Sequence, residues 1–477
     1  MKKIYISVIL VFSTVLFTGC NWLDVHPVDE VDKASMYATT DGFYNVLNGV
    51  YLSIGAPEMY GENMTWGAME AWGRAYALDK NNTSHEKLYS LQECMYDSKS
   101  VMALAESIWK NCYLNIARLN DFIQEANRKP ENFFTNGDVE RKLLIGEAMG
   151  LRAMIHFDLF RIFGESPSHP TDAEKAYVPY VDVYPSKSNP PTPVDEFMGK
   201  VEQDLSKAAE MVAAYDTTKL HRFEVLNQDQ RLSDKLPEWG RFYSHRGARL
   251  NYYAIRILQS RVALYNKDYE SASTFAGEIL DLVNSKELKY TGSGKIATEP
   301  KFMSETLFSF YYDLLKEATQ NKFDFTKPSC LKVEDYGIFT KVNGDKRKDM
   351  ISNKVLNIYT NDSKEEYIPS IRFTEAFYIM GECLAHQDGK LIEAIDMFNK
   401  FRMNRGVYSA SAKVSTDVTS EQFIKILIED ARREFAGLGQ NVFIYKRLNL
   451  PVEYSEGVFA ESKGNLRLGV PQSESAI

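Results

Sequence analysis

Apolar residues recur at steps of three and four over long parts of this 477-residue chain, and this spacing constrains its fold more than any other feature. Residues at that spacing lie on one side of a helix, so the pattern predicts amphipathic helices whose apolar faces pack together. The stripes predict helices at about 144–162, 194–214 and 421–437. A polar surface loop is expected at 216–243. Weak periodicity predicts a loop-rich lobe from 52–100, 285–365 and 448–477.

Two segments of the chain share the order helix, tight turn, helix. In the first, apolar stripes at 250–265 and 269–283 flank the turn Asn266-Lys267-Asp268; in the second, stripes at 373–384 and 391–398 flank Asp388-Gly389. Each second helix has a small alanine near its start, Ala272 or Ala394, which would let the paired helices approach closely. This pattern is tetratricopeptide-like. Since the copies lie far apart in sequence, we expect units embedded in a larger, mostly α-helical fold.

The first twenty residues have the order of a bacterial export signal. Met1-Lys2-Lys3 is positively charged, Ile4 to Phe17 is apolar, and Thr18-Gly19 supplies small residues directly before Cys20. The apolar run is too short to span a bilayer of ~30 Å as a helix. We therefore predict a signal peptide at 1–19 and a lipid on the thiol of Cys20, with more than one acyl chain for stable anchoring. The alternative is a plain signal peptide followed by an incidental cysteine.

Composition and charge narrow the class of protein. The chain is 44% hydrophobic and 25% charged, as in soluble globular proteins, and no later stretch is apolar for 18 residues. Its formal net charge is −9. The predicted mature chain is more acidic still, because removal of the signal peptide takes away Lys2 and Lys3. Binding of nucleic acid rests on neutralising phosphates, so we expect no nucleic-acid partner.

The remaining cysteines do not indicate a metal site. Cys94, Cys112, Cys330 and Cys383 contain no CxxC pair, which argues against zinc. Export permits disulfides, and only Cys94 and Cys112 are close enough in sequence to suggest one. Cys383 lies in an apolar helical stripe and is expected to be a buried thiol.

No catalytic motif is present in the sequence. The chain lacks HExxH, GxSxG, a Walker loop and a calcium loop, and Gly292-Ser293-Gly294-Lys295 is interpreted as a turn. His156 follows Arg152 by four residues on a predicted helix, which favours a structural hydrogen-bonding role over that of a base. We therefore predict no catalytic residue, metal or cofactor. Carboxylate pairs for glycoside hydrolysis have no fixed sequence spacing, so a hydrolase stays open as an alternative.

Aromatic residues in the unpatterned segments are the candidate ligand-binding residues. Trp66, Trp72 and Tyr76 occur in a glycine-rich stretch, and Tyr311 and Tyr312 follow the strand-like residues 307–310. A flat exposed ring can cover the apolar C–H face of a sugar or a peptide side chain while its polar neighbours bond hydroxyl groups. The alternative is that these rings seal the core of the lobe.

Several segments, in order along the chain, resemble the SusD/RagB family of outer-membrane nutrient-binding lipoproteins. The start Cys20-Asn21-Trp22-Leu23-Asp24-Val25-His26-Pro27 is similar to the family's C-x-[FW]-L-D-x-x-P opening. Residues Glu147 to Gly164 match its E-A-x-x-L-R-A-x-x-x-F-x-L-x-x-x-x-G element. Further likenesses lie at 41–51, 109–120 and 372–406. Arg432-Arg433-Glu434-Phe435 and Gly439-Gln440 resemble the closing R-R-E-L-x-x-E-G-Q-R-W-x-D-x-x-R signature.

The closing signature also departs from the family pattern. Leu438, Asn441, Val442 and Ile444 stand where the family has Glu, Arg, Trp and Asp, so three charges are missing together. Replacing a buried ion network by neutral packing as a unit can be energetically neutral, whereas losing one partner costs several kcal/mol. We interpret the signature as structural.

The resemblance implies a fold and a function. It implies a tetratricopeptide-like helical scaffold with a variable loop-rich lobe over residues 20–477. It also implies a surface-exposed, outer-membrane lipoprotein that captures oligosaccharides or peptides and delivers them to a SusC-like TonB-dependent transporter. No catalytic residues come with the family. The alternatives are a surface glycan hydrolase and a tetratricopeptide scaffold for envelope assembly.

Overall fold

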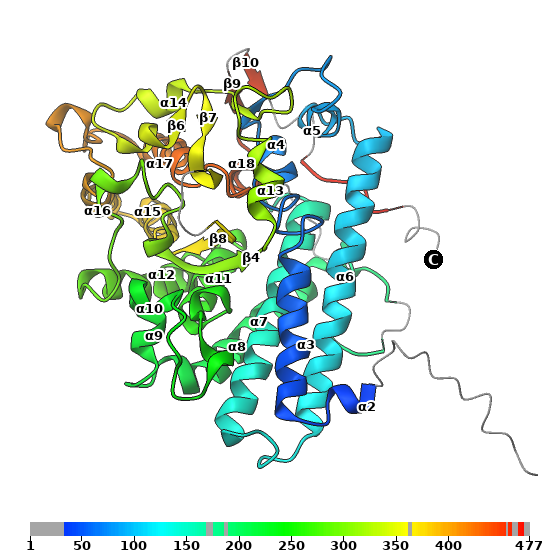
Figure 1. Ribbon diagram of the computed structural model, residues 1–477. Coiled ribbons are helices and arrows are strands. Elements are labelled where there is room, and N and C mark those ends of the chain that lie inside the picture. Colours follow the sequence, from blue (N-terminus) through cyan, green and yellow to red (C-terminus); the bar gives the residue numbers. More distant parts are fainter. Residues whose placement is uncertain are drawn as a thin grey trace, which may run out of the picture.

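The computed structural model describes residues 33–167, 175–185, 189–360, 365–454, 457–459 and 466–471. The predicted signal peptide and Cys20 lie outside these residues. The described part of the chain begins with a short helix, α2 (Lys33–Met36), next to the lower ends of the long helices in Figure 1.

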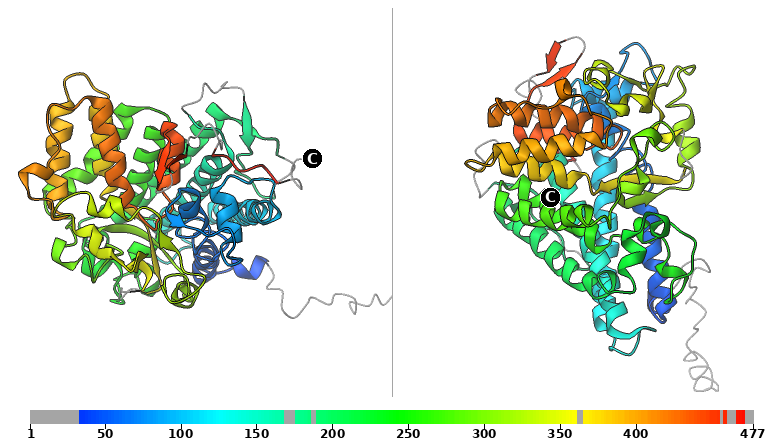
Figure 2. Two further views of the ribbon diagram at one scale, coloured as in Figure 1. Left: turned by 90° about the horizontal axis from the view of Figure 1, so that it is seen from above. Right: turned by 90° about the vertical axis from the view of Figure 1, so that its left-hand side faces the viewer.

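Most of the molecule is a succession of packed helices, as expected from the apolar stripes. The first four long helices are α3 (Thr40–Ile54), α6 (Lys99–Arg128), α7 (Gly137–Phe163) and α8 (Val194–Asp216). The next five are α11 (Tyr252–Tyr265), α12 (Tyr269–Asn284), α15 (Glu375–Ala385), α16 (Leu391–Met403) and α17 (Ser420–Glu434). Each helix packs on the next from α3 to α8, then α8 on α11, α11 on α12, α12 on α15, and α15 on both α16 and α17. Figures 1 and 2 show this row of helices from three directions.

The two predicted helix pairs are confirmed, and their turns explain why they form. Lys267 has a φ of 62° between α11 and α12, and Asp268 then caps α12 by accepting a hydrogen bond from the Ser271 N–H (3.0 Å). Between α15 and α16, Gly389 has a φ of 74°, which glycine adopts without strain. Ala272 and Ala394 are fully buried at the helix contacts.

The loop-rich lobe consists of short elements that lie in the upper half of Figure 1. Its helices and strands are α4 (Ala68–Trp72), β1 (Tyr76–Ala77), α5 (Glu86–Gln92), α13 (Leu315–Gln320), β5 (Lys332–Val333), α14 (Gly337–Thr340), β6 (Ile351–Ser352) and β7 (Val355–Leu356). The strands form a small antiparallel sheet in the order β1-β5-β7-β6. A second antiparallel pair, β4 (Thr306–Tyr311) with β8 (Tyr367–Arg372), lies where the lobe meets the scaffold, and Tyr311 is paired with Tyr367 in register.

The remaining elements flank these two parts. Strands β2 (Ala176–Val178) and β3 (Thr192–Pro193) pair ahead of α8, and β9 (Val452–Tyr454) pairs with β10 (Gly457–Phe459). Between α8 and α11 lie α9 (Arg222–Leu226), α10 (Gln228–Arg231) and the 3₁₀ turns η3 (Arg241–Tyr243) and η4 (Arg246–Ala248). The predicted loop at 216–243 is therefore partly helical.

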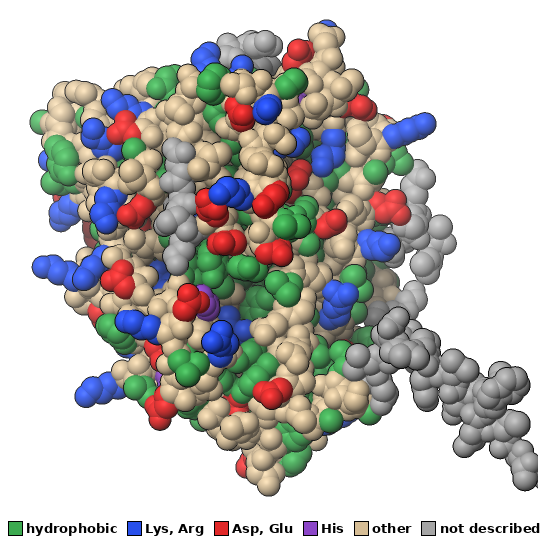
Figure 3. Space-filling model, in the orientation of Figure 1, with side chains coloured by type: hydrophobic (Ala, Val, Ile, Leu, Met, Phe, Trp, Pro, Cys, Tyr) green, Lys and Arg blue, Asp and Glu red, His purple; other side chains and the backbone are tan. Residues whose placement is uncertain are grey.

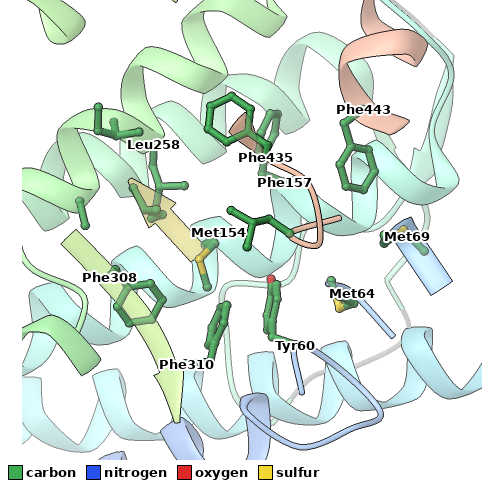
Figure 4. Close-up of a cluster of buried hydrophobic side chains, with 14 of the residues drawn as sticks. Tyr60, Met64, Met69, Met154, Phe157, Leu258, Phe308, Phe310, Phe435 and Phe443 are labelled. Carbon is green, nitrogen blue, oxygen red and sulfur yellow. The ribbon is translucent and has the colours of Figure 1, made fainter. Parts of the chain in front are cut away.

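One hydrophobic core joins scaffold and lobe. Figure 4 shows side chains of α7, of β4 and of the segment after α3 pointing into one cluster. At its centre the Tyr60 and Phe310 rings stack with their centroids 4.0 Å apart, and the Tyr60 hydroxyl donates to Asp158 (2.6 Å). Within the described residues, no helix combines the length and apolar character needed to cross a membrane.

A buried ion network holds the closing part of the chain. The Arg347 guanidinium donates to Asp430 (2.8 and 2.9 Å) and to Asp345 (2.7 Å), and Arg405 donates to Glu434 (2.7 and 2.9 Å). Burial alone would raise the pKa of Asp430, but Arg347 and neighbouring guanidinium groups hold it well below its usual range. Glu434 belongs to the closing signature, so this geometry supports its structural interpretation.

The structure corrects one detail predicted from the sequence and decides a second. The segment after Gly437, for which the sequence predicts no helix, contains α18 (Asn441–Leu448), which is buried on several sides and therefore has no single apolar stripe. Cys94 and Cys112 do not form a disulfide, because both thiols are free. The expected buried thiol of Cys383 is confirmed.

The structural role predicted for His156 is confirmed. Its Nδ1 lies 2.9 Å from the Arg152 carbonyl oxygen, and its Nε2 accepts a hydrogen bond from the Val181 N–H (3.0 Å). Burial lowers the pKa of His156 to about 3, so the imidazole stays neutral.

Candidate functional site

An open groove of about 670 Å³ lies between α3 and the segment 241–249. Tyr311 and Tyr367, the paired residues of β4 and β8, close one end of it. In Figure 3 this face shows hydrophobic side chains gathered in a hollow near its centre, with acidic and basic side chains around it. Its volume and its mix of aromatic and polar walls are those of a small-ligand site.

Helix α3 supplies one wall because its two faces differ. Phe43, Leu47, Val50 and Ile54 form the buried apolar stripe that packs on the scaffold. A second face of the helix lines the groove. Its residues follow the same steps of three and four along the chain: Asp41, Asn45, Asn48 and Leu52. The Thr39 side chain begins the helix by accepting a hydrogen bond from the Gly42 N–H (3.2 Å).

Two stacked rings form the floor of the groove. The Tyr44 and Phe242 rings have centroids 3.9 Å apart and are inclined by 16°. The Arg249 guanidinium lies 3.8 Å from the centroid of the Phe242 ring and donates to the Asn48 side-chain oxygen (2.9 Å). The floor is therefore fixed from both sides of the groove.

Carboxylates beneath the floor hold the tyrosines in place. The hydroxyls of Tyr44 and Tyr243 both donate to Glu140, and the Tyr51 hydroxyl donates to Glu147 (2.9 Å). Burial would raise the pKa of Glu147, but the guanidinium groups of Arg249 and Arg246 lower it. Burial raises the pKa of Tyr51 well above its usual value, so its hydroxyl stays a neutral donor.

His245 joins the end wall to the loop before η3. Its Nδ1 lies 3.2 Å from the Tyr367 hydroxyl, and its Nε2 lies 3.0 Å from the exposed Asp234 carboxylate. The Tyr311 ring meets Tyr367 edge to face, with centroids 5.6 Å apart. Burial raises the pKa of Tyr367 to about 12. Tyr311 is 36% exposed, so part of its ring faces the solvent at the groove.

Three of the five rings proposed from the sequence are instead part of the core. The indole N–H groups of Trp66 and Trp72 donate to the Gly61 carbonyl (2.8 Å) and the Tyr96 hydroxyl (3.2 Å), and the Tyr76 hydroxyl donates to the Trp66 carbonyl (2.6 Å). All three rings are buried. They seal the lobe, which was the alternative interpretation, and offer no face to a ligand in this structure.

Of the other two, Tyr311 lines the groove, and Tyr312 is half-buried just beyond it. The sequence pattern does not by itself assign the other groove residues to this site: Tyr44, Tyr51, Phe242, Arg249 and Tyr367. The α3 residues could have been found as a second stripe beside the apolar stripe of Phe43, Leu47, Val50 and Ile54. The others come from distant segments, and no sequence period connects them to α3.

The groove offers both apolar and polar recognition. Within the described residues, no hydrogen bond or ion pair engages the side chains of Asp41, Asn45 or Arg241. These groups could accept from, or donate to, ligand hydroxyls beside the rings. Across the same part of the chain, no cluster of His, Cys, Asp or Glu side chains is arranged to hold a metal ion.

Comparisons with known proteins agree with this architecture. A SusD-like family described as "Starch-binding associating with outer membrane" matches residues 21–224. No curated protein matches the chain. Among solved structures, a putative sugar binding protein from Bacteroides vulgatus has a TM-score of 0.71 at 18% identity, covering 92% of this chain and 96% of that one. A SusD superfamily protein from Bacteroides thetaiotaomicron has a TM-score of 0.70 at 20% identity, covering 92% and 98%.

These likenesses define the class as a mostly α-helical protein with the fold of the SusD superfamily over nearly its whole length. The resemblance predicted from the sequence is borne out by the family match over residues 21–224 and by the shared fold of these solved structures.

Proposed function

We propose that this protein is a cell-surface lipoprotein that binds oligosaccharides in the groove beside α3 and delivers them to a SusC-like TonB-dependent transporter. The observation that carries the proposal is the groove itself, in which exposed ring surface lies beside unengaged polar side chains. The family description, starch binding in association with the outer membrane, supports the same ligand class.

The chemistry of the groove suits a sugar. A pyranose presents apolar C–H groups on its faces and hydroxyls at its rim, so one ligand needs both rings and hydrogen-bonding groups. Tyr311 and the Tyr44–Phe242 pair provide the rings, while Asp41, Asn45 and Arg241 lie at the rim. A protein that hands its ligand on should bind weakly; a Kd of about 1 mM corresponds to about −4 kcal/mol.

The proposed location rests on the N-terminal sequence. Cleavage before Cys20 and acylation of its thiol would tether the mature chain to the outer membrane, and the segment from Asn21 to Asp32 would connect the lipid to α2. Replacing Cys20 by alanine should abolish labelling by a palmitate analogue and release the protein from the membrane fraction. Retention of the label would contradict the anchor.

Binding in the groove is tested with purified mature protein and maltohexaose by calorimetry. We expect the double variant Tyr311→Ala/Asn45→Ala to reduce the affinity at least about tenfold, because it removes a ring and a rim group. The matched control is Tyr408→Ala, which removes a tyrosine ring that is 62% exposed and does not line the groove. Equal binding by the double variant and the control would contradict the proposed site.

Two further results separate the proposal from its alternatives. Co-purification of the tagged protein with an outer-membrane barrel supports delivery of the ligand to a transporter. Co-purification with envelope assembly machinery instead favours the alternative of a tetratricopeptide scaffold for envelope assembly. Appearance of new reducing ends during incubation with glycans would favour a hydrolase.

A further inference from the structure

A second hollow, of about 410 Å³, lies between α9, α10 and the segment after α12. It shares no lining residue with the groove beside α3. In Figure 1, α9 and α10 lie at the lower left, away from α3. The two hollows are therefore separate surfaces.

The charges around this hollow are mostly positive. Lys219, Lys286 and Lys289 line it, and within the described residues none of the three ammonium groups has an ion pair or a hydrogen bond. Arg222 adds a fourth cation, against the acids Glu287 and Asp229 (the only two carboxylates among its described lining residues). This excess contrasts with the net charge of −9 of the whole chain. Because cations near one another repel, an anionic ligand would be favoured here.

The walls of the hollow are held in a fixed arrangement. Arg222, at the start of α9, donates to both carboxylate oxygens of Glu287 (2.8 and 2.9 Å), which links α9 to the segment after α12. The Asn227 side chain accepts a hydrogen bond from the Asp229 N–H (2.9 Å) and thereby shapes the start of α10. Less ordering is needed when a ligand enters a surface that is already shaped.

The hollow also offers groups that suit a sugar ring. Phe223 lines the hollow and its side chain is 58% exposed, which leaves an aromatic face available for C–H groups. The Gln228 amide is exposed beside it and can bond hydroxyls. A simple inorganic anion would make no use of this ring.

We propose that this hollow is a second saccharide site that accepts a sugar bearing a carboxylate or a sulfate. Lys219, Lys286 and Lys289 bind the anionic group, and Phe223 covers the face of the ring. The site acts independently of the groove beside α3, so the protein can hold a chain with acidic sugars at two separate points.

The test measures binding of tetragalacturonate and of a chondroitin sulfate tetrasaccharide to the mature protein, with maltotetraose as the neutral probe. The triple variant Lys219→Gln/Lys286→Gln/Lys289→Gln should lose at least about tenfold in affinity for an anionic probe. The matched control is Lys80→Gln/Lys348→Gln/Lys413→Gln, which makes the same change in net charge at exposed lysines outside the hollow. Equal losses in the two triple variants would overturn the proposal.

Three more measurements define the ligand class. Raising NaCl from about 50 to about 200 mM should weaken anionic binding, since salt screens exposed charges. Phe223→Ala should weaken saccharide binding several-fold without lowering the melting temperature. Tyr311→Ala/Asn45→Ala should leave anionic binding unchanged, which separates this site from the groove. In the Tyr311→Ala/Asn45→Ala background, where the groove is impaired, equally tight binding of maltotetraose or of a poly-glutamate peptide would overturn the assignment to an acidic sugar.

Discussion

Tyr44 and Phe242 stack at the floor of the groove with their ring centroids 3.9 Å apart, one from α3 and the other from the turn η3. The pair joins the two walls of the groove. Phe242 also supports the Arg249 guanidinium at 3.8 Å. The floor of the groove thus depends on the packing of two segments that are distant in sequence.

Replacing Phe242 by alanine should weaken both functions of this pair. We expect the affinity for maltohexaose to fall about tenfold and the free energy of unfolding to fall by about 1–2 kcal/mol, because a stack and a cation–π contact are lost. Calorimetry and urea denaturation measure the two effects. Phe242→Tyr keeps the ring and should bind nearly as the native protein does; a loss as large as that of the alanine variant would argue against a stacking role.

Trp72 should prove to be a stability residue. Its ring is 2% exposed and its indole N–H is bonded to Tyr96, so Trp72→Ala opens a cavity and should lower the free energy of unfolding by about 3–5 kcal/mol. Thermal unfolding measures this loss, with Tyr408→Ala as a control that leaves the melting temperature unchanged. If Trp72→Ala abolished sugar binding at an unaltered melting temperature, the ring would belong to the ligand site after all.

The buried ion network should be sensitive to the loss of a single charge. Asp430→Asn leaves the guanidinium groups of Arg347 and Arg433 short of a partner, which should cost about 3–5 kcal/mol in urea denaturation. Glu421→Gln on the same helix removes an exposed ion pair with Lys425 and should cost less than about 0.5 kcal/mol. Similar costs for the two variants would show that the network contributes no more than surface charge does.

Glu70 should make the stability of the protein depend on pH. Its carboxylate accepts hydrogen bonds from the N–H groups of Gly437 (2.8 Å) and Gly439 (2.7 Å), but burial outweighs these bonds and raises its pKa from 4.5 to about 7. The folded state therefore holds a proton more tightly than the unfolded state does. The resulting stabilisation is complete below pH 4.5 and is lost as the pH rises through about 7, up to about 3 kcal/mol in total.

The comparison of native protein with Glu70→Gln isolates this effect. The glutamine has no charge to titrate, so the variant lacks this pH dependence. The free energy of unfolding of the native protein should therefore fall relative to that of Glu70→Gln as the pH rises from about 5 to about 8. Urea denaturation at several pH values measures the difference. A difference that stays constant over this range would mean that Glu70 has an ordinary pKa.

The helical scaffold could be predicted from the sequence because local features specify it. The stripes at 250–265 and 269–283, the cap at Asp268 and the glycine turn at Gly389 each lie within one short segment. Helix α18 was missed because both of its sides are buried, which removes the period that would have revealed it.

The groove could be predicted only in part because it forms from segments that are far apart in sequence. Tyr311 was identified as a ring at the end of a strand, but its partners on α3 and at 241–249 come close only in the folded chain. Trp66 and Trp72 look exposed in a glycine-rich segment. Those glycines instead permit tight turns that bury the rings; a Cβ at Gly61 would lie 2.4 Å from the Gly55 carbonyl oxygen.

Helix α3 places the residues that attach it to the core and the residues that line the groove on different faces. Since Phe43, Leu47, Val50 and Ile54 hold the helix in the protein, Asp41, Asn45 and Leu52 are free to change without disturbing that attachment. Related proteins could therefore come to accept different ligands through substitutions along one face of this helix, while the rest of the fold stays as it is.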